Sequence, residues 1–372
     1  MPRRMNENWI SDLEINNYKS IKNIKMDCRR INVLIGRPNV GKSNILEALA
    51  LYTAPYADNT KKFLSDYVRY EKLNDLFYFL DRKEQVSIIS NLGFAALRFH
   101  MNGINGYDFI TGPDIAILDS MNQSGSGNSL MEKNIFFQSI VEGRREEAKA
   151  VKPYYAEFTA DERLHTPFSN NNLGYGSPIK KYHFKSLLEY KNNFPSFLLP
   201  PYGNNLFTIL EGNPQLWDEC AGIFNNYGLD LLLDTIEEKL AIQRRAGRFV
   251  TNVPYSLTAD TLQRYIFHLA AIETNNNSIL LFEEPESHSF PPYISQLASK
   301  IIESESNQFF IATHSPYLLT PFIEQVPPGE ISIFVARYEN YETKIKALSE
   351  QEIDNIMETG IDLFFNIPAF QE

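Results

Sequence analysis

The chain has 372 residues, of which 43% are hydrophobic, 13% aromatic and 22% charged, and its formal net charge is −11. This composition predicts a folded protein of two or three domains and excludes an intrinsically disordered chain. The negative balance also excludes a nucleic-acid binder that relies on overall positive charge, so any DNA contact must come from a local patch or a partner protein.

Targeting segments and cysteines narrow the class further. No stretch approaches the roughly 20 apolar residues of a membrane-spanning helix, and the N-terminus lacks the apolar segment of a secretory signal. The two cysteines, Cys28 and Cys220, are far apart and in no metal-ligand spacing, which argues against a disulfide framework and a structural zinc site. We therefore expect a reduced, cytoplasmic protein without a membrane partner.

The first fifty residues predict a strand, a turn, a second strand, a loop and a helix. Segment 9–15 alternates in hydrophobicity as a half-buried strand does, and 17–22 predicts a turn into the second strand. The short apolar run 31–35 suits the centre of a sheet. A glycine-containing loop over 36–43 then leads into a helix over 44–51.

The middle of the chain predicts helices, then strands, then helices again. A helical pattern covers about 52–85, and a strand pattern with glycine turns covers 86–119. Polar, glycine-rich loops follow within 120–180, and helices interrupted by proline and glycine are expected over 185–234. Strands and helices alternate again from residue 239 onward, with a last strand over 331–336 and a final helix over 350–365.

Residues Gly36-Arg-Pro-Asn-Val-Gly-Lys-Ser43 form a complete Walker A pattern. The two glycines let the backbone form a nest of N–H groups for phosphate oxygens, Lys42 supplies positive charge to the β- and γ-phosphates, and Ser43 supplies a hydroxyl to Mg²⁺. The helix that follows favours an anion at its N-terminus. A chance glycine-rich turn is the alternative, but the preceding strand and the following helix favour a phosphate loop. The expected nucleotide-binding residues are Gly36, Arg37, Pro38, Asn39, Val40, Gly41, Lys42, Ser43 and Asn44.

A second constellation is the apolar strand over 278–286, which ends in carboxylates. Ligands bind at the carboxyl edge of sheets of this kind. Glu283 would hold Mg²⁺ through water, and Glu284 would polarise an attacking water. The alternative is a strand end with surface acids, and the upstream Walker A pattern favours the catalytic interpretation.

A further apolar strand, over 307–316, ends in Thr-His-Ser. A histidine is more often structural than functional, but His314 follows the strand after the acidic one and is placed to touch a γ-phosphate. The other histidines receive the structural interpretation, because they lack partners in sequence.

The segment 255–264 leads into a predicted helix just before the acidic strand. Its small polar residues would accept a γ-phosphate from a second subunit at the N-terminus of that helix. The alternative is an ordinary helix cap by Ser256, Thr258 or Asp260.

Together these motifs resemble the ATP-binding-cassette (ABC) ATPases of the RecF, SMC and OLD (overcoming lysogenisation defect) type. The resemblance implies an α/β P-loop head, with a mixed and parallel sheet flanked by helices and an antiparallel β subdomain. It makes Glu-Glu-Pro-Glu over 283–286 the Walker B and D-loop run and His314 the switch histidine. It also implies ATP and Mg²⁺ as cofactors. The residues that carry it are Ile15-Asn-Asn-Tyr-Lys-Ser-Ile-Lys22, the run 35–49, the run 282–291 and Ile311-Ala-Thr-His-Ser-Pro316.

Within this superfamily the chain looks most like the stand-alone ATPases of bacterial anti-phage systems, such as the ATPase subunits of PARIS and Septu and the ATPase half of OLD nucleases. This narrower resemblance implies a head-to-head dimer or higher homo-oligomer that controls a separate effector, such as a nuclease or a toxin. We expect no TOPRIM nuclease in this chain, since little sequence follows the switch histidine, and no Cys/His cluster suggests another nuclease.

Several residues depart from the family pattern. Glu283 stands where Walker B usually has aspartate, which lengthens the reach to the metal. The signature loop should resemble Leu-Ser-Gly-Gly-Gln, but the segment from Ser256 to Asp260 lacks both glycines. Asp260 places negative charge near a phosphate bound to the second subunit. Either the dimer contacts ATP differently from the family pattern, or hydrolysis is slow. The signature serine aligns with Ser256 or Thr258, and the Q-loop has only the weak candidate Gln85.

Four arginines are further candidates for phosphate contact. Arg37 lies in the phosphate loop, and Arg244, Arg245 and Arg248 form a cluster further along the chain. Pairing with surface acids is an equally good interpretation of all four.

The spacing of the motifs indicates an insertion. Lys42 and Glu284 are 242 positions apart, considerably more than the compact cassettes of the resemblance use. The loops and short helices in between exclude a long coiled-coil arm. We divide the chain into the N-terminal part of the head with Walker A (1–119), an inserted, mainly helical lobe (120–238), and the C-terminal part with the signature-like loop, Walker B and the switch histidine (239–372).

Three functions remain open at this stage. The first is a slow ATPase in anti-phage defence that controls an effector. The second is a RecF-like, DNA-binding ATPase of DNA repair, against which the acidic balance counts mildly. The third is a slowly hydrolysing, nucleotide-gated scaffold, which the altered signature loop favours. A small-molecule kinase or a GTPase is disfavoured, since no guanine-reading Asn-Lys-x-Asp occurs.

Overall fold

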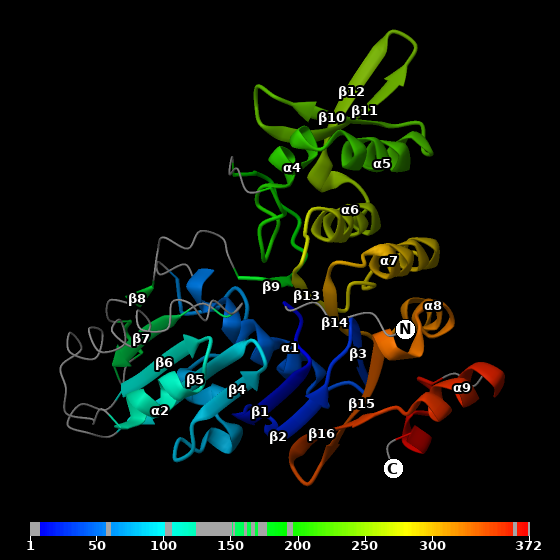
Figure 1. Cartoon of the computed structure of the whole chain (residues 1–372). Helices are drawn as coiled ribbons and strands as arrows, with labels where there is room; N and C mark the ends of the chain where they lie inside the picture. The colour runs from blue at the N-terminus through cyan, green and yellow to red at the C-terminus, as the bar shows by residue number, and fades with distance from the viewer. Residues whose placement is uncertain are drawn as a thin grey trace.

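The computed structural model describes residues 8–56, 61–100, 106–123, 151, 153–159, 162–164, 168–169, 177–191, 196–359 and 363–370. Within these ranges the strands form three sheets, of seven, six and three strands. Figure 1 shows the six-stranded sheet in the middle of the molecule, with the seven-stranded sheet beside it and the three-stranded sheet at the far end of a row of helices. No helix in the described ranges is long and apolar enough to cross a membrane.

The six-stranded sheet carries the motifs. Its strand order is β16-β15-β3-β14-β13-β9, and every pairing is parallel except that of β16 with β15. The Walker A segment follows β3 and the acidic segment follows β13. These two strands are parallel, and β14 lies between them. The strands are β3 (Ile31–Gly36), β9 (Ile179–Tyr182), β13 (Ile279–Glu283), β14 (Gln308–Ala312), β15 (Ile331–Glu339) and β16 (Glu342–Ala347).

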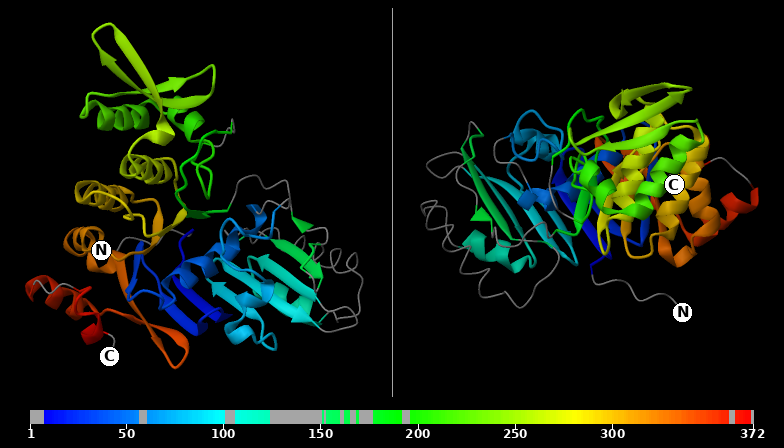
Figure 2. Two further views of the ribbon diagram at one scale, coloured as in Figure 1. Left: turned by 180° about the vertical axis from the view of Figure 1, so that it is seen from behind. Right: turned by 90° about the horizontal axis from the view of Figure 1, so that it is seen from above.

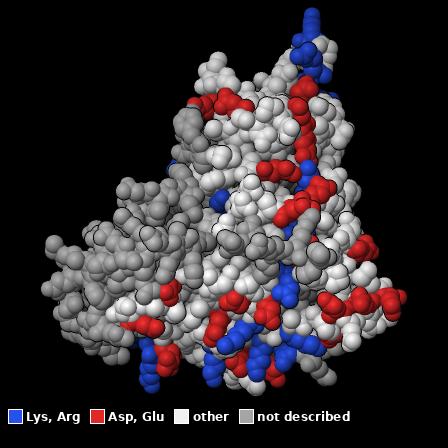
Figure 3. Space-filling model, viewed as in Figure 1, with Lys and Arg blue, Asp and Glu red and all other residues white. Residues whose placement is uncertain are grey.

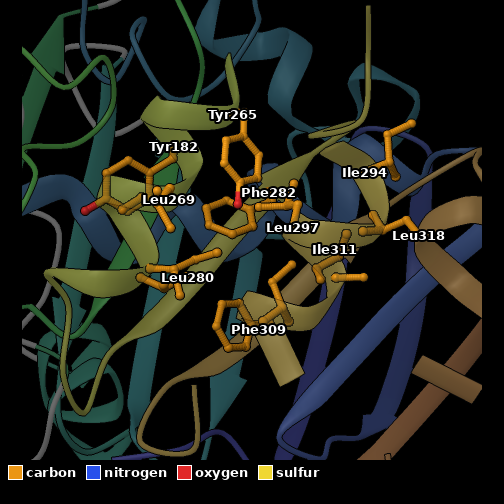
Figure 4. Close-up of a cluster of buried hydrophobic side chains, with 14 of the residues drawn as sticks. Tyr182, Tyr265, Leu269, Leu280, Phe282, Ile294, Leu297, Phe309, Ile311 and Leu318 are labelled. Atoms are coloured by element: carbon orange, nitrogen blue, oxygen red, sulfur yellow. The ribbon is translucent and has the colours of Figure 1, made fainter. Parts of the chain in front are cut away.

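Helices cover one face of this sheet, and alternate residues of each strand face alternate cores. Leu280 and Phe282 of β13 point into a core shared with the helices, whereas Leu281 points into a second core with α1 (Lys42–Ala50). Burial on both faces explains why these strands are almost continuously apolar in sequence. Figure 4 shows the first core, where Phe282 lies among side chains from neighbouring strands and helices. The covering helices are α6 (Asp260–Glu273), α7 (Pro291–Glu303) and α8 (Pro316–Gln325).

The seven-stranded sheet is antiparallel and has the order β2-β1-β4-β5-β6-β7-β8. It is the antiparallel subdomain that the resemblance implied, and α1 lies between it and the parallel sheet. Its strands are β1 (Asp12–Tyr18), β2 (Ile21–Asp27), β4 (Val86–Ser90), β5 (Gly93–His100), β6 (Gly106–Gly112), β7 (Tyr154–Thr159) and β8 (Phe168–Ser169), and α2 (Ala116–Gln123) follows β6.

The helices expected over 52–85 are wrong in kind. Among the described residues of this segment, the helical elements are short 3-10 turns, at Leu51–Tyr56, Leu73–Leu76 and Tyr78–Leu80. Leu64 and Phe79 have φ of 53° and 50°, and a left-handed residue ends a regular α-helix. Tyr67 and Phe77 of this segment are buried in the core with the antiparallel sheet, whereas Phe79 is 61% exposed.

The inserted segment differs from a single helical lobe. Strands β7 and β9, which lie inside 120–238, pair with strands of the two head sheets. In the parts of 185–234 that the structure describes, 185–191 and 196–234, the regular helices are α4 (Leu206–Gly212) and α5 (Pro214–Asn225), and Asp230–Asp234 is a strand. That strand, β10, pairs with β11 (Lys239–Ala246), and β11 pairs with β12 (Phe249–Pro254), so the lobe extends past residue 238.

The C-terminal elements are close to the prediction. The last strand continues beyond residue 336 to Glu339 and turns back as β16, which the sequence pattern did not indicate. The terminal helix α9 covers Glu350–Thr359 and is shorter than predicted.

Candidate nucleotide-binding site

A hollow of about 540 Å³ lies at the carboxyl ends of β3, β13 and β14. This is the edge of a parallel sheet at which ligands bind. Most of the residues predicted from the Walker A pattern line it together with both predicted catalytic side chains. The lining residues are Ser20, Pro38, Asn39, Val40, Gly41, Lys42, Ser43, Asn44, Arg69, Glu284, Ala312, His314 and Tyr338.

The phosphate loop needs its two glycines for steric reasons. Gly36 has a φ of 150°, and a Cβ there would lie 2.5 Å from the carbonyl oxygen of Ala336. Gly41 has a φ of 94°, and a Cβ there would lie 2.1 Å from Oγ1 of Thr343. Gly41 is also the N-cap of α1, so the loop ends at a helix N-terminus that favours anions.

Lys42 is folded back onto the phosphate loop. Its Nζ donates hydrogen bonds to the carbonyl oxygens of Gly36 (3.0 Å) and Arg37 (2.9 Å). Burial lowers the pKa of Lys42 to about 8, although the three nearby carboxylates of Glu284, Glu283 and Glu286 act in the opposite direction. The ammonium is therefore held inside the nest with few solvent contacts, ready to exchange carbonyl partners for phosphate oxygens.

Two residues outside the Walker A pattern brace the loop. Thr343 on β16 donates to the carbonyl oxygen of Val40 at 2.9 Å and lies 2.6 Å from the hydroxyl of Ser20. Asn44 donates to that Ser20 hydroxyl at 2.7 Å. The turn between β1 and β2, the start of α1 and β16 thus meet at the back of the loop. Sequence reasoning gave Asn44 only a nucleotide role and gave Thr343 none.

Ser43 and Glu283, the predicted Mg²⁺ ligands, lie within hydrogen-bonding reach of each other. Burial raises the pKa of Glu283, but Lys181, the Ser43 hydroxyl and Arg69 together outweigh burial and hold that pKa below its ordinary value. A hydroxyl beside an ionised carboxylate at a phosphate nest is a donor set that suits Mg²⁺. The residues present therefore fit the metal that the motif implies.

Two cations face the same carboxylate. Nη2 of Arg69 lies 2.9 Å from Oε1 of Glu283, and Nζ of Lys181 lies 3.5 Å from Oε2. Arg69 also pairs with the fully buried Glu47 at 2.7 Å, and Lys19 donates to the second oxygen of Glu47. These five residues form one ion network under the nucleotide site. Glu47 and Arg69 share the role of connecting the phosphate-loop helix to the acidic strand.

Glu284 and His314 face each other at the mouth of the hollow. Oε1 of Glu284 lies 3.6 Å from Nε2 of His314. Glu284 has a φ of 45°, and its side chain is half exposed. Burial, with the positive charge of Lys42, lowers the pKa of His314, although Glu284 opposes this effect. The imidazole is therefore neutral at pH 7 and the carboxylate has access to solvent, which suits a pair that handles water and phosphate.

Glu286 holds the histidine loop from behind. Its Oε1 accepts hydrogen bonds from the Thr313 hydroxyl at 2.6 Å and from the backbone N–H of His314 at 2.9 Å. Its Oε2 is buried and has no hydrogen-bond partner among the described residues. Burial raises the pKa of Glu286 although both hydrogen bonds lower it. The sequence analysis assigned this glutamate to the D-loop run without a role.

The signature candidates lie elsewhere. Ser256 and Thr258 do not line the hollow, and Thr258 donates to the carbonyl oxygen of Tyr255 at 2.7 Å. The alternative of a helix cap by these residues is wrong, because Ala259 is the N-cap of α6 and no side chain caps it. Asp260 pairs with Arg264 at 2.6 Å, which offsets part of its negative charge. Arg37 is exposed and does not line the hollow either.

Sequence reasoning missed most of the supporting charges. Lys19 and Ser20 lie in the quoted run 15–22, which signalled the family but gave no role to either residue. Arg69 and Lys181 lie in segments that were interpreted only as helix and loop. No local spacing connects these residues to the Walker motifs, so only the fold brings them together.

Two models of known protein families match parts of this chain. Residues 9–158 match the family model described as "AAA ATPase domain". Residues 224–320 match the model described as "AAA domain, putative AbiEii toxin, Type IV TA system". The fold, the site and these two matches support the resemblance to ABC-type P-loop ATPases of the RecF, SMC and OLD kind. The fold class expected from the sequence is thereby confirmed.

Individual relatives are distant. A Helicobacter pylori protein named ATP/GTP phosphatase is 22% identical over 330 residues, which cover 82% of this chain and 85% of that protein. Among solved structures, an SMC head bound to the C-terminal winged-helix domain of ScpA aligns with 92% of this chain and 99% of its own, at 14% identity and a TM-score of 0.48. The SMC head domain from Thermotoga maritima aligns with 91% and 99%, at 12% identity and a TM-score of 0.42.

Proposed function

We propose that this chain binds ATP with Mg²⁺, hydrolyses it when two copies close over the nucleotide, and thereby controls a separate effector in anti-phage defence. The observation that carries the proposal is the convergence of Lys42, Ser43, Glu284 and His314 from three distant segments around one hollow. The match of residues 224–320 to a family described by a toxin and a toxin–antitoxin system supports the defence role.

Each residue of the hollow has a distinct task. The N–H groups of the nest and Lys42 would bind the β- and γ-phosphates, and Ser43 and Glu283 would hold the metal, which neutralises charge on the phosphates. Glu284, whose side chain reaches solvent, would accept a proton from the attacking water. Neutral His314, 3.6 Å away, would donate a hydrogen bond toward the γ-phosphate.

The position of the signature candidates supports closure of two copies. Ser256 and Thr258 lie outside it, so they would meet a nucleotide only if they came from a second copy. Glu284 is half exposed, and the approach of a second copy would exclude water around it. The oligomer would be a head-to-head dimer or a larger assembly built from it.

The decisive variant is E284Q. It should bind ATP as the wild type does, hydrolyse it about 10²–10⁴-fold more slowly, and accumulate as a closed dimer in ATP. Nucleotide binding is followed with a fluorescent ATP analogue, hydrolysis by phosphate release, and mass by light scattering. E303Q makes the same chemical change on exposed Glu303, at the end of α7, and should behave as wild type.

Two outcomes count against the proposal. Equal hydrolysis by E284Q and wild type removes Glu284 from its role, and a K42A variant that still binds ATP removes the phosphate loop. A wild-type protein that binds ATP but releases no phosphate supports the nucleotide-gated scaffold instead. A nuclease or toxin gene beside the gene of this chain supports the defence role, whereas an isolated housekeeping context favours DNA repair.

A further inference from the structure

The hairpin formed by β11 and β12 projects from the rest of the molecule. The last buried residue of β11 is Ile242, and all residues of 244–252 are exposed. Phe249 and Val250 are 66% and 51% exposed although both are apolar. Figures 1 and 2 show the hairpin extending alone beyond α5 and the short strand β10. Nothing in the fold of the head requires such an extension.

Three arginines occupy the end of this hairpin. Arg244, Arg245 and Arg248 are all exposed, and none lies within 4.0 Å of an acidic oxygen in the described part of the chain. The acid closest in strand register is Asp230, which is opposite Gln243. Pairing with surface acids, the alternative interpretation of this cluster, is therefore not what the structure contains. Figure 3 shows the resulting blue tip at the top of the molecule.

The local geometry spreads the three charges around the ribbon. Ala246 pairs with Phe249 across a two-residue turn, and Gly247 has the positive φ of 59° that such a turn requires. Arg244 and Arg245 are adjacent on one strand, so their side chains leave on opposite faces. Arg248 lies in the turn itself, next to the ring of Phe249 at 5.3 Å.

The ribbon separates these charges from an acidic body. At roughly 3.3 Å per residue, Arg244 and Arg245 lie about 7 and 10 Å beyond Ile242, and the turn with Arg248 begins about 16 Å beyond it. Exposed charges in physiological salt are screened over about 8 Å. The net charge of −11 therefore acts on the tip only weakly. A polyanion that the body repels still meets a concentrated positive tip.

We propose that this hairpin, residues 243–252, binds duplex DNA through its phosphate backbone, with the ribbon in or along the major groove. Arginine is well suited to phosphate, and the major groove of B-form DNA admits a two-stranded β-ribbon. The deep, narrow major groove of duplex RNA does not admit one. An acidic protein surface would pair with the same arginines, but Arg244 and Arg245 leave the ribbon on opposite faces, and the two walls of a groove can contact both faces whereas a flat surface contacts one. On DNA the ring of Phe249 would contact bases or sugars at the groove wall.

The test compares charge removal at the tip with equal charge removal elsewhere. A fluorescein-labelled 30-base-pair DNA duplex is titrated with wild type, with R244Q/R245Q/R248Q, and with K22Q/K25Q/K83Q, which removes three exposed lysines from the body. We expect the arginine triple variant to bind at least tenfold more weakly. The slope of log affinity against log salt should become shallower by about 2.7, at roughly 0.9 per lost phosphate contact. F249A should weaken binding without changing the slope.

The outcomes separate this proposal from the ATPase proposal. ATP binding and hydrolysis in the absence of DNA should be the same in the arginine triple variant as in wild type. Equal DNA binding and salt slope in wild type and the arginine variant overturn the assignment, and so does an equal loss in the lysine variant. Tighter binding to duplex RNA than to duplex DNA, or loss of only a protein partner in the arginine variant, also overturns it.

Discussion

Arg69 donates a hydrogen bond to Glu283 across 2.9 Å, although 214 positions separate them in the chain. Glu283 is the carboxylate that the Walker B interpretation expects to hold Mg²⁺. A guanidinium on Oε1 and the Lys181 ammonium near Oε2 therefore occupy the oxygens that the metal-bound water would use. Metal binding at this position has to displace or rearrange at least one of these cations.

This arrangement predicts how nucleotide binding depends on magnesium. In R69Q, the competing charge at Glu283 is reduced, so the Mg²⁺ concentration that gives half-maximal ATP binding should fall several-fold. The measurement is a Mg²⁺ titration at fixed concentrations of protein and fluorescent ATP. K62Q, which removes an exposed cation from the same segment, serves as the control. A Mg²⁺ midpoint that rises in R69Q would mean that Arg69 assists the nucleotide instead of competing with the metal.

The pKa of Lys42 predicts a pH dependence of ATP affinity. Burial lowers that pKa to about 8 in the free protein. Phosphate attracts the ammonium and not the neutral amine, so affinity should be highest below pH 8. It should fall by up to tenfold per unit as the pH rises above 8, with uptake of about one proton on binding. Titrations from pH 6.5 to 9.5 measure this fall.

An arginine at the same position separates this effect from general loss of structure. The guanidinium of K42R stays charged over the whole range, so any ATP binding that K42R retains should be independent of pH. A wild-type affinity that stays constant up to pH 9.5 would contradict the lowered pKa.

Glu47 should be a large contributor to stability because it is fully buried between two cations. E47Q leaves Lys19 and Arg69 without their carboxylate, and breaking a buried pair destabilises a fold by about 3–5 kcal/mol. Since Arg69 is largely exposed, we expect the lower end of that range. The control E14Q breaks the exposed Lys25–Glu14 pair and should change the free energy of unfolding by less than about 1 kcal/mol. Urea unfolding measures the change in the free energy of unfolding for both variants. Equal changes in E47Q and E14Q would refute the stabilising role of the buried ion network.

Glu286 is predicted to act as a positioning residue for His314. E286Q keeps an oxygen for the Thr313 hydroxyl and the His314 amide, and it mimics the protonated carboxyl that burial favours. It should retain most of the ATPase activity. E286A removes the acceptor and should lower kcat about tenfold while KM for ATP changes little. A parallel loss in both variants, or a change confined to KM, would argue against this positioning role.

The phosphate loop and the two carboxylates beside it were predictable because each is a contiguous run. A strand, Gly36–Ser43 and a helix already contain the geometry of a phosphate nest, since a glycine conformation and a helix N-terminus are local properties. The same holds for Glu283 and Glu284, which end a continuously apolar strand. Their placement beside the nest needed only the rule that parallel strands present ligands at one edge.

The placement of the supporting charges and the exposure of the arginine hairpin were decided by the tertiary structure. Lys19, Arg69 and Lys181 reach one carboxylate network only because the antiparallel sheet, the irregular segment over 61–80 and β9 all pack around α1. The arginine cluster at 244–248 is visible in the sequence, but nothing local tells whether acids neutralise it. Its exposure depends on how far the ribbon extends from its neighbours, and that is set by long-range packing and not by the residues of the hairpin.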